Sequence, residues 1–139
     1  MIKRKVQVIT QRYKGDLHRG VDLRCVDGLY KLQPCIAARD AVVIRNSIDN
    51  GKDGYGNHYI VYRLDTGQIL KSIHVQPEKG IKNGVSVIKN QVLGWQVIGG
   101  NSNSLHEHFE VWSEDGKESY DPILYFIQNH IDYQFKAGA

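Results

Sequence analysis

The 139-residue sequence contains only two cysteines and three prolines. It has no apolar run near the ~18 residues that a membrane-spanning helix requires. Disulfide scaffolds are denser in cysteine, so we interpret Cys25 and Cys35 as buried free thiols, with a bridge between them as the alternative. Their spacing matches no common zinc–cysteine pattern. The sequence therefore predicts neither a membrane span nor a disulfide-dependent fold.

Clustered charge of one sign is also lacking. The 18 lysines and arginines exceed the 15 acidic residues by a net charge of only +3, and no basic stripe carries interleaved aromatic residues. We therefore expect no nucleic-acid partner and no membrane partner, although mild positive charge favours anionic surfaces such as bacterial cell walls. Residues 1–5 resemble the basic end of a secretion signal, but no apolar run follows, so no signal peptide is predicted.

Alternating apolar and polar residues predict β-strands along most of the chain. The predicted strands are Lys5–Thr10, Pro34–Arg45, Asn57–Leu64, Gln68–Val75, Gly84–Ile88, Gln91–Ile98 and Leu105–Trp112. Asp65-Thr66-Gly67 is typical of a hairpin turn. We predict a single all-β domain over residues 1–139, with a mainly antiparallel sheet in an open half-barrel or sandwich.

Only the C-terminal end has a helical pattern. Asp121 can cap a helix and Pro122 suits its first position. We expect a short helix there, and its predicted apolar face consists of Ile123, Leu124, Ile127 and Ile131.

Two short segments carry the residues with the clearest chemistry. In extended strands, side chains two or four positions apart share a face, so His18 pairs with Asp22 and His106 with His108. Gly20 adds no side chain between the first two, which leaves space there. Two neutral imidazoles and one carboxylate favour a divalent metal, and three protein ligands leave a fourth position for water. The pattern predicts a zinc hydrolase site, with a remaining histidine for proton transfer.

Two further residues become candidates for the site because a zinc ligand set is predicted nearby. His74 follows Leu70 and Ser72 on one face of a predicted strand. A lone strand histidine is usually structural, but a hydrolytic zinc site needs a group that orients water and shields an oxyanion. Glu110 shares a face with His106 and His108, so it either orients a ligand imidazole or pairs within the sheet.

Motifs along nearly the whole chain, in order, resemble the lysostaphin-like (LytM-domain) zinc endopeptidases of peptidoglycan. The first and last histidine motifs, residues 18–22 (HRGVD) and 106–111 (HEHFEV), are specific in combination. Between and after them lie segments similar to further family motifs: residues 34–43, 54–57 (GYGN), 72–75, 87–94 and 121–122.

The resemblance implies a role for each histidine. His18, Asp22 and His108 correspond to the family's zinc ligands, so Zn²⁺ is the implied cofactor. His106 corresponds to a catalytic base or orienting group, and His74 to its partner. The implied activity is hydrolysis of peptide bonds in peptidoglycan, outside the cell or on a virion. A phage- or prophage-encoded lytic protein (an endolysin) that works with other virion or lysis proteins is the expected context.

One departure and two rival functions follow from the same residues. Glu107 replaces an apolar residue between the two histidines, and the alternation places it on the opposite face, where it points to solvent or else raises the pKa of nearby histidines. A non-haem iron oxygenase also uses two histidines and a carboxylate, but its carboxylate commonly lies two residues after the first histidine. A catalytically silent wall-binding or virion assembly module is the second rival.

Overall fold

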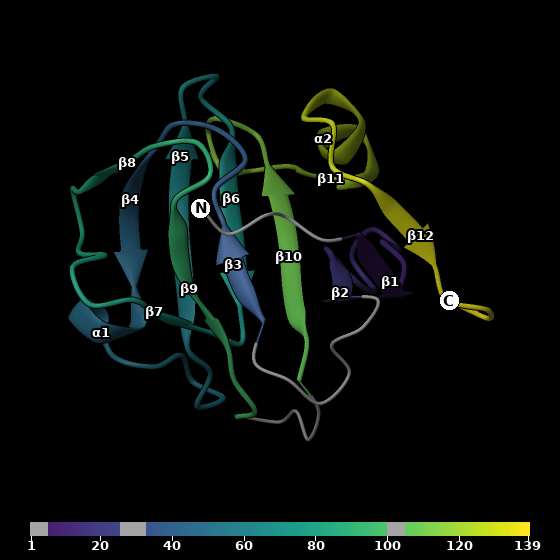
Figure 1. Cartoon of the computed structure of the whole chain (residues 1–139), viewed down its shortest axis with the longest axis horizontal. Helices are drawn as coiled ribbons and strands as arrows, with labels where there is room; N and C mark the ends of the chain where they lie inside the picture. The colour runs from purple at the N-terminus through teal and green to yellow at the C-terminus, as the bar shows by residue number, and fades with distance from the viewer. Residues whose placement is uncertain (1–5, 26–32, 100–104) are drawn as a thin grey trace.

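The computed structural model of the chain describes residues 6–25, 33–99 and 105–139. Two β-sheets lie face to face, a nine-stranded sheet behind a three-stranded one in Figure 1. The larger sheet is open and mixed, and no closed barrel forms among these residues. All its pairings are antiparallel except that of β1 with β12. The predicted all-β class is therefore confirmed.

The larger sheet has the strand order β12-β1-β2-β10-β6-β5-β4-β8, and β11 pairs with the end of β10. Its strands are β1 (Gln7–Gln11), β2 (Val21–Cys25), β4 (Ala41–Asn46), β5 (Tyr59–Leu64), β6 (Ile69–Ile73), β8 (Ser86–Val87), β10 (Glu107–Trp112), β11 (Ser119–Tyr120) and β12 (Tyr133–Phe135). The smaller sheet has the order β3-β9-β7, from β3 (Pro34–Ile36), β9 (Val92–Gln96) and β7 (Val75–Pro77).

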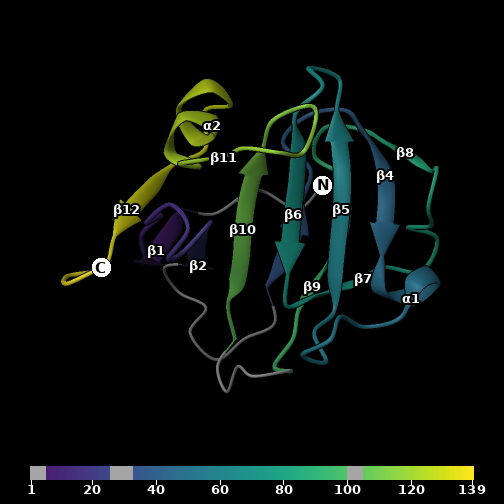
Figure 2. The same ribbon diagram turned by 180° about the vertical axis from the view of Figure 1, so that it is seen from behind.

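Alternation along the central strands separates a core face from an open face. In β5, β6 and most of β10, every second residue is buried and its neighbours are partly exposed. The buried set joins residues of the smaller sheet in one apolar core, which includes Ile60, Leu70, Phe109, Val75 and Leu93. The opposite face of β10, β6, β5 and β4 is turned to the viewer in Figure 2. His108 and Glu110 belong to this open face because they alternate with buried Phe109.

The strand predictions hold for the central hairpin, but two predicted strands are divided: Gln68–Val75 ends as β6 at Ile73, and Val75 already belongs to β7 of the smaller sheet. β5 and β6 form the expected hairpin, closed by a hydrogen bond from the Gly67 amide to the Leu64 carbonyl. The predicted strand Pro34–Arg45 is wrong as one element, because it divides into β3 and β4, which lie in different sheets. The bend at residues 37–40 carries the chain from one layer to the other.

The predicted C-terminal helix is α2 (Ile123–Gln128), and the Asp121 carboxylate accepts a hydrogen bond from its first amide as expected. Half of its predicted apolar face is wrong, since Leu124 and Ile127 are 61% and 57% exposed, whereas Ile131 is buried and Ile123 packs against the core. Tyr125 and Phe126 are buried instead, and Phe126 stacks on Phe109 of β10 with ring centroids 5.7 Å apart. In so short a helix the larger aromatic side chains determine which side faces the core.

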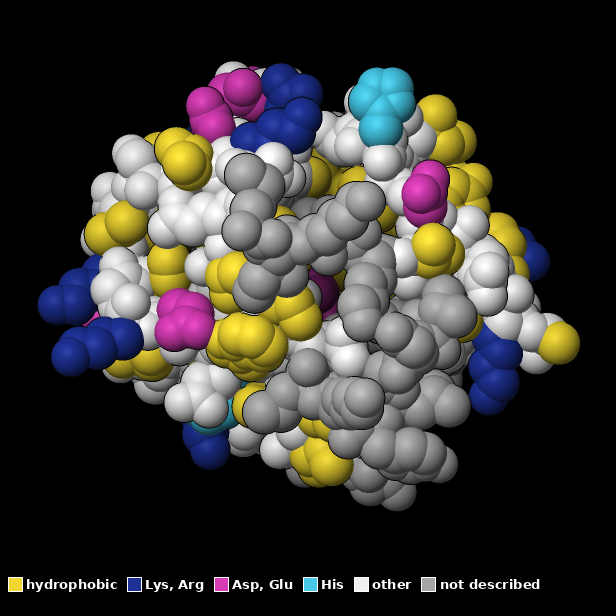
Figure 3. Space-filling model, viewed as in Figure 1, with side chains coloured by type: hydrophobic (Ala, Val, Ile, Leu, Met, Phe, Trp, Pro, Cys, Tyr) yellow, Lys and Arg dark blue, Asp and Glu magenta, His cyan; other side chains and the backbone are white. Residues whose placement is uncertain are grey.

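A second short helix, α1 (Ser47–Asn50), was not predicted. The Asn46 side chain caps it by accepting hydrogen bonds from the amides of Ile48 and Asp49. Among the described residues, no helix has the length and apolar content needed to cross a membrane. In the described part of the face shown in Figure 3, lysine and arginine side chains lie at the margins and form no continuous stripe.

Candidate metal centre

The three predicted metal ligands converge at the junction of β2 and β10. Asp22 and His108 are directly opposite one another in the register of these antiparallel strands. One oxygen of Asp22, Oδ1, lies 2.9 Å from Nδ1 of His108 and 3.5 Å from Nε2 of His18. One ligand atom from each residue lies within 4.8 Å of the other two. The geometry suits a single cation held by two nitrogens and one oxygen.

His18 reaches the cluster from a turn and not from a strand, so its predicted extended conformation is wrong. β2 begins only at Val21, and the amide of His18 bonds to the Gly15 carbonyl in the preceding turn. Nδ1 of His18 lies 2.7 Å from the Arg12 carbonyl oxygen. A carbonyl can only accept, so Nδ1 of His18 donates to it and Nε2 is the nitrogen that faces Asp22. The Arg12 carbonyl had no sequence signal, because every residue supplies one.

Gly20 has a different role from the one predicted. We expected its missing side chain to open space between His18 and Asp22. A Cβ built on Gly20 would instead collide with the carbonyl oxygen of Phe109 and lie 2.9 Å from Cγ of Glu110. Glycine is therefore required for the close approach of this turn to β10, which places His18 beside His108.

Both ring nitrogens of His108 face carboxylates. Nδ1 faces Asp22, and Nε2 lies 2.8 Å from Oε2 of Glu110. The other oxygen of Glu110 accepts a hydrogen bond of 2.7 Å from the Trp112 indole. Burial alone would lower the pKa of His108, but its hydrogen bonds to Asp22 and Glu110 raise it to about 9. Glu110 thus holds the ring from behind and leaves Nδ1 for a cation, which is the orienting arrangement and not mere pairing within the sheet.

Asp22 is held in its charged form by its surroundings. Burial favours the neutral acid, but the hydrogen bond from His108 and the charges of His106, His108 and His18 outweigh it, so the pKa of Asp22 lies below its usual value. Its side chain is only 13% exposed. A buried carboxylate that stays ionised is the form that binds a divalent metal.

The predicted pair His106 and His74 lies at the edge of this cluster. Their ring centroids are 4.7 Å apart, and Nε2 of His106 lies 3.9 Å from Oδ1 of Asp22. All five predicted site residues therefore lie in one connected group.

His74 is not a strand residue, as was predicted, but occupies a left-handed bend (φ 66°) between β6 and β7. Backbone hydrogen bonds to His58 and Val97 hold this bend. Burial first, then the charges of His106 and His108, lower the pKa of His74 to about 4, so its ring is neutral at neutral pH. Its buried Nδ1 has no hydrogen-bond partner among the described residues.

Glu107 lies on the face opposite His108, as predicted, but it does not point to solvent. Its side chain is buried, and the Cys35 thiol lies 3.9 Å from its Oε2. The smaller sheet covers this face, which a single strand's alternation does not reveal. Cys35 is a buried free thiol as predicted. The side chain of Cys25 lies outside the described residues.

The donor set fits zinc on its own chemistry. Each of the two imidazoles has one nitrogen engaged, by Arg12 in His18 and by Glu110 in His108, and their other nitrogens lie 3.5 and 2.9 Å from the same oxygen of Asp22. Hydrogen bonds that fix the tautomers of ligand histidines are characteristic of protein zinc sites. Among the described residues, no cysteine belongs to this group of metal-binding side chains.

No protein-family model and no curated protein matches this sequence. The structure nevertheless resembles solved structures. It superposes on the antimicrobial peptidase lysostaphin from Staphylococcus simulans with a TM-score of 0.65 and 21% identity over 86% of this chain, and spans half (50%) of that chain. The catalytic domain of lysostaphin gives a TM-score of 0.61 and 20% identity over 90% of this chain and 92% of that one.

Two other structures are similar to the same degree. A zinc containing peptidase from Vibrio cholerae gives a TM-score of 0.61 and 20% identity over 85% of this chain and 38% of that one. A chain of the SpoIIIAH–SpoIIQ complex gives a TM-score of 0.64 and 18% identity over 84% of this chain and 90% of that one. These likenesses show that the chain has the fold of the lysostaphin-like LytM domain.

Proposed function

We propose that the protein is a zinc metallo-endopeptidase that hydrolyses peptide bonds of bacterial peptidoglycan. The observation that carries the proposal is the convergence of His18, Asp22 and His108 beside the paired rings of His74 and His106. The fold is shared with lysostaphin, an antimicrobial peptidase, and with a zinc containing peptidase. Both comparisons support the proposed chemistry.

The metal would be held by Nε2 of His18, a carboxylate oxygen of Asp22 and Nδ1 of His108. Zinc, when bound, supplies a water whose pKa is lowered towards ~7 and polarises the scissile carbonyl. Glu110 and the Arg12 carbonyl keep the two ligand rings in the required tautomers. Asp22 contributes negative charge that neither histidine provides.

The remaining two histidines move the protons. Because the His74 ring is neutral at neutral pH, it can accept a proton from the attacking water. One imidazole of the His74–His106 pair takes that proton and returns it to the leaving amine, and the other donates a hydrogen bond to the oxyanion. General base catalysis of this kind contributes ~10²–10⁴-fold to the rate.

The test separates metal loss from catalytic loss. We expect His18→Ala, Asp22→Ala and His108→Ala to lose bound zinc and activity together. His106→Ala and His74→Asn should keep zinc but lose at least ~10²-fold in cleavage of peptidoglycan. Asparagine is chosen at His74 because it tolerates the left-handed backbone. His130→Asn, at another left-handed histidine, is the control and should match the wild type.

Zinc is measured by elemental analysis after gel filtration, and cleavage by mass spectrometry of the released fragments. Folding of each variant is checked by thermal denaturation. Equal zinc loss in all five site variants would contradict the division of roles. Zinc retention in all five would contradict the metal site itself.

Phage or prophage origin and action on the wall from outside the cell or from a virion belong to the same proposal. The second candidate function is a silent binding or assembly module of this fold. It is favoured by one observation, that the fold also occurs in a two-protein complex of SpoIIIAH with SpoIIQ. A protein that binds zinc and peptidoglycan, yet releases no fragment, would support this second candidate.

A further inference from the structure

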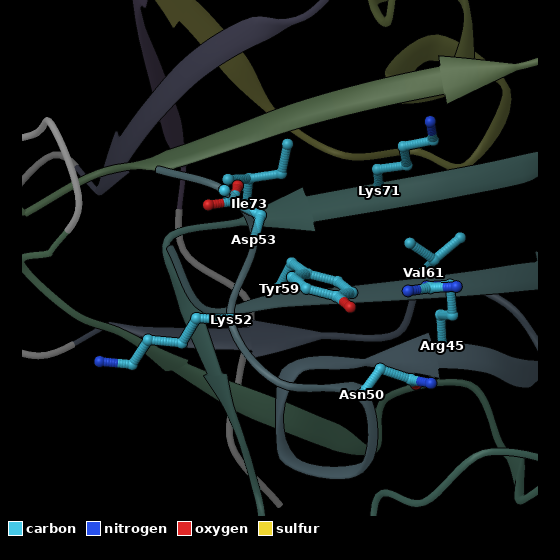
Figure 4. Close-up of a pocket in the computed structure, with 9 residues that line it drawn as sticks. Arg45, Asn50, Lys52, Asp53, Tyr59, Val61, Lys71 and Ile73 are labelled. Carbon is cyan, nitrogen blue, oxygen red and sulfur yellow. The ribbon is translucent and has the colours of Figure 1, made fainter. Parts of the chain in front are cut away.

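A groove continues from the metal centre across the open face of the larger sheet. In the strand register His108 lies opposite Ile73 of β6, and Ile73 lies opposite Tyr59 of β5. Ile73 and Tyr59 line a cavity of about 450 Å³ between this face and the loop that contains Asp53. Figure 4 shows both side chains on the strands that form its floor. The groove therefore begins one strand away from a proposed zinc ligand.

The groove carries an excess of positive charge. Its lining includes three cations, Arg45, Lys52 and Lys71, and a single acid, Asp53. Arg45 and Lys71 flank Val61 in one row across β4, β5 and β6, as Figure 4 shows. Lys52 points away from this row in the same view. We call the surface formed by Tyr59, Val61, Ile73, Arg45 and Lys71 the cationic groove.

Neither cation forms a close ion pair within the described part of the chain, although Lys71 lies opposite Glu110 in the register of β6 and β10 and its charge helps to lower the pKa of Glu110. Among the described residues, neither Arg45 nor Lys71 has a carboxylate oxygen within 4.0 Å. Asp53 is occupied by its own loop, because its carboxylate accepts hydrogen bonds from the amides of Tyr55 and Asn57 and from the Asn57 side chain. Lys71 contacts the Trp112 ring, with its Nζ 4.5 Å from the ring centroid. Arg45 is thus left for a ligand, and Lys71 adds positive charge beside the apolar floor while it also faces Glu110.

The geometry points to the cationic groove as a subsite for a free carboxylate of the substrate, so that the enzyme prefers acidic peptides to uncharged oligoglycine. This inference rests on the proposed function, because it takes the metal centre as the place of cleavage. Neighbouring strands lie ~4.8 Å apart, which places β4 about 14 Å from β10. An extended peptide advances ~3.3–3.6 Å per residue, so the carboxylate lies about two to four residues from the cleaved bond.

The chemistry of the two cations fits that ligand. Arginine binds a carboxylate through two parallel N–H donors, and the apolar surface of Val61 and Ile73 weakens competition from water. Oligoglycine offers only backbone groups to such a surface. Because both cations are partly or fully accessible to solvent, added salt screens the attraction.

The test uses three peptides with blocked termini and a protein variant that keeps zinc but does not cleave its substrate. The first is L-alanyl-γ-D-glutamyl-L-lysyl-D-alanine with a free α-carboxylate on its glutamyl residue. The second carries a carboxamide at that atom, and the third is pentaglycine. Binding to zinc-loaded His106→Ala protein is measured by titration calorimetry in 50 mM and 500 mM salt. We expect the carboxylate peptide to bind about fivefold more tightly than the carboxamide peptide or pentaglycine at low salt, with the difference lost at high salt.

Substitutions in the same background identify the groups responsible. Arg45→Gln and Lys71→Gln should each reduce the preference, and together abolish it, while Arg45→Lys restores part of it. Lys79→Gln removes an exposed lysine outside the groove and should leave the preference unchanged. Equal binding of the carboxylate and carboxamide peptides, or a preference that survives the double substitution, overturns the inference.

Cleavage by the wild-type protein keeps the two proposals apart. Hydrolysis of both glutamyl peptides at equal rates would overturn the carboxylate subsite and leave the peptidase function standing. A salt-sensitive binding preference without hydrolysis of any peptide would support the subsite and contradict the peptidase function.

Discussion

His108 is the residue on which the metal centre depends most, because its two nitrogens have separate tasks. Nε2 is held by Glu110, and Nδ1 faces Asp22, where a cation or a proton can bind. The proton is held tightly, as the raised pKa of about 9 shows. Zinc and this proton therefore compete for Nδ1.

Removal of the carboxylate behind His108 should weaken zinc binding. We expect Glu110→Ala to lower zinc affinity by roughly 10–100-fold, because the ring loses its orienting acceptor. Glu110→Gln should cost much less, since its amide oxygen can still accept from Nε2 of His108. Competition titration with a fluorescent chelator measures the affinity. Trp112→Phe, which removes the indole N–H that donates to Glu110 but keeps an aromatic ring, is the control, and an unchanged affinity in Glu110→Ala would contradict the orienting role.

The pKa values of two histidines predict how stability depends on pH when a chelator keeps the protein free of zinc. His108 has a pKa of 6.5 when unfolded and about 9 when folded, so the folded state holds its proton more tightly. Its stabilisation is complete below pH 6.5 and is lost as pH rises towards 9, by up to about 3 kcal/mol. The pKa of His74 falls instead to about 4, so its contribution is lost as pH falls from 6.5.

The free energy of unfolding in urea should therefore be highest near pH 6.5. The loss on the alkaline side should disappear in His108→Gln, and the loss on the acid side should shrink in His74→Asn. An alkaline loss of the same size in wild type and His108→Gln would show that His108 does not cause it.

The close contact between the turn at Gly20 and β10 is the structural element that assembles the ligands. Phe109 and Glu110 leave no room for a Cβ at residue 20. The two strands that bear Asp22 and His108 are neighbours in the sheet although their sequence separation is 86 residues. Tertiary pairing therefore brings the ligands together, and the turn adds His18.

Gly20→Ala should displace this turn and weaken zinc binding together with stability. We expect a loss of unfolding free energy of about 1–3 kcal/mol, as is usual for overpacking against a backbone that cannot move freely. Gly54→Ala is a suitable control, because a Cβ there meets no atom within 4 Å. Thermal denaturation and zinc content report the two effects. Wild-type zinc affinity and stability in Gly20→Ala would contradict the packing role.

The strand alternation predicted which residues share a face, but not what covers each face. It placed His108 and Glu110 together and Glu107 on the other side, all of which the structure bears out. It could not predict that the smaller sheet buries Glu107, because that contact joins residues far apart in sequence. The turn conformation of His18 and the left-handed bend at His74 were missed for a related reason, since periodicity describes only regular elements.

For the whole molecule, one side of the larger sheet stabilises the fold and the other carries the proposed site. The core lies between the two sheets, while the ligand cluster and the cationic groove share the open face. This separation lets the groove change in charge without disturbing the core. We expect Arg45→Gln and Lys71→Gln to leave the thermal unfolding temperature within about 2 °C of wild type, because surface substitutions of this kind usually change stability by less than ~0.5 kcal/mol.

The peptidase proposal is tested best by zinc-dependent release of fragments from purified peptidoglycan. The protein is stripped with a chelator, dialysed, and supplied with one equivalent of zinc, with Asp22→Ala treated in parallel. We predict that mass spectrometry finds fragments with a new amine and a new carboxylate at a peptide bond, only from wild-type protein with zinc. Undiminished release in chelator, or no release by wild-type protein at any zinc concentration, would contradict a zinc peptidase.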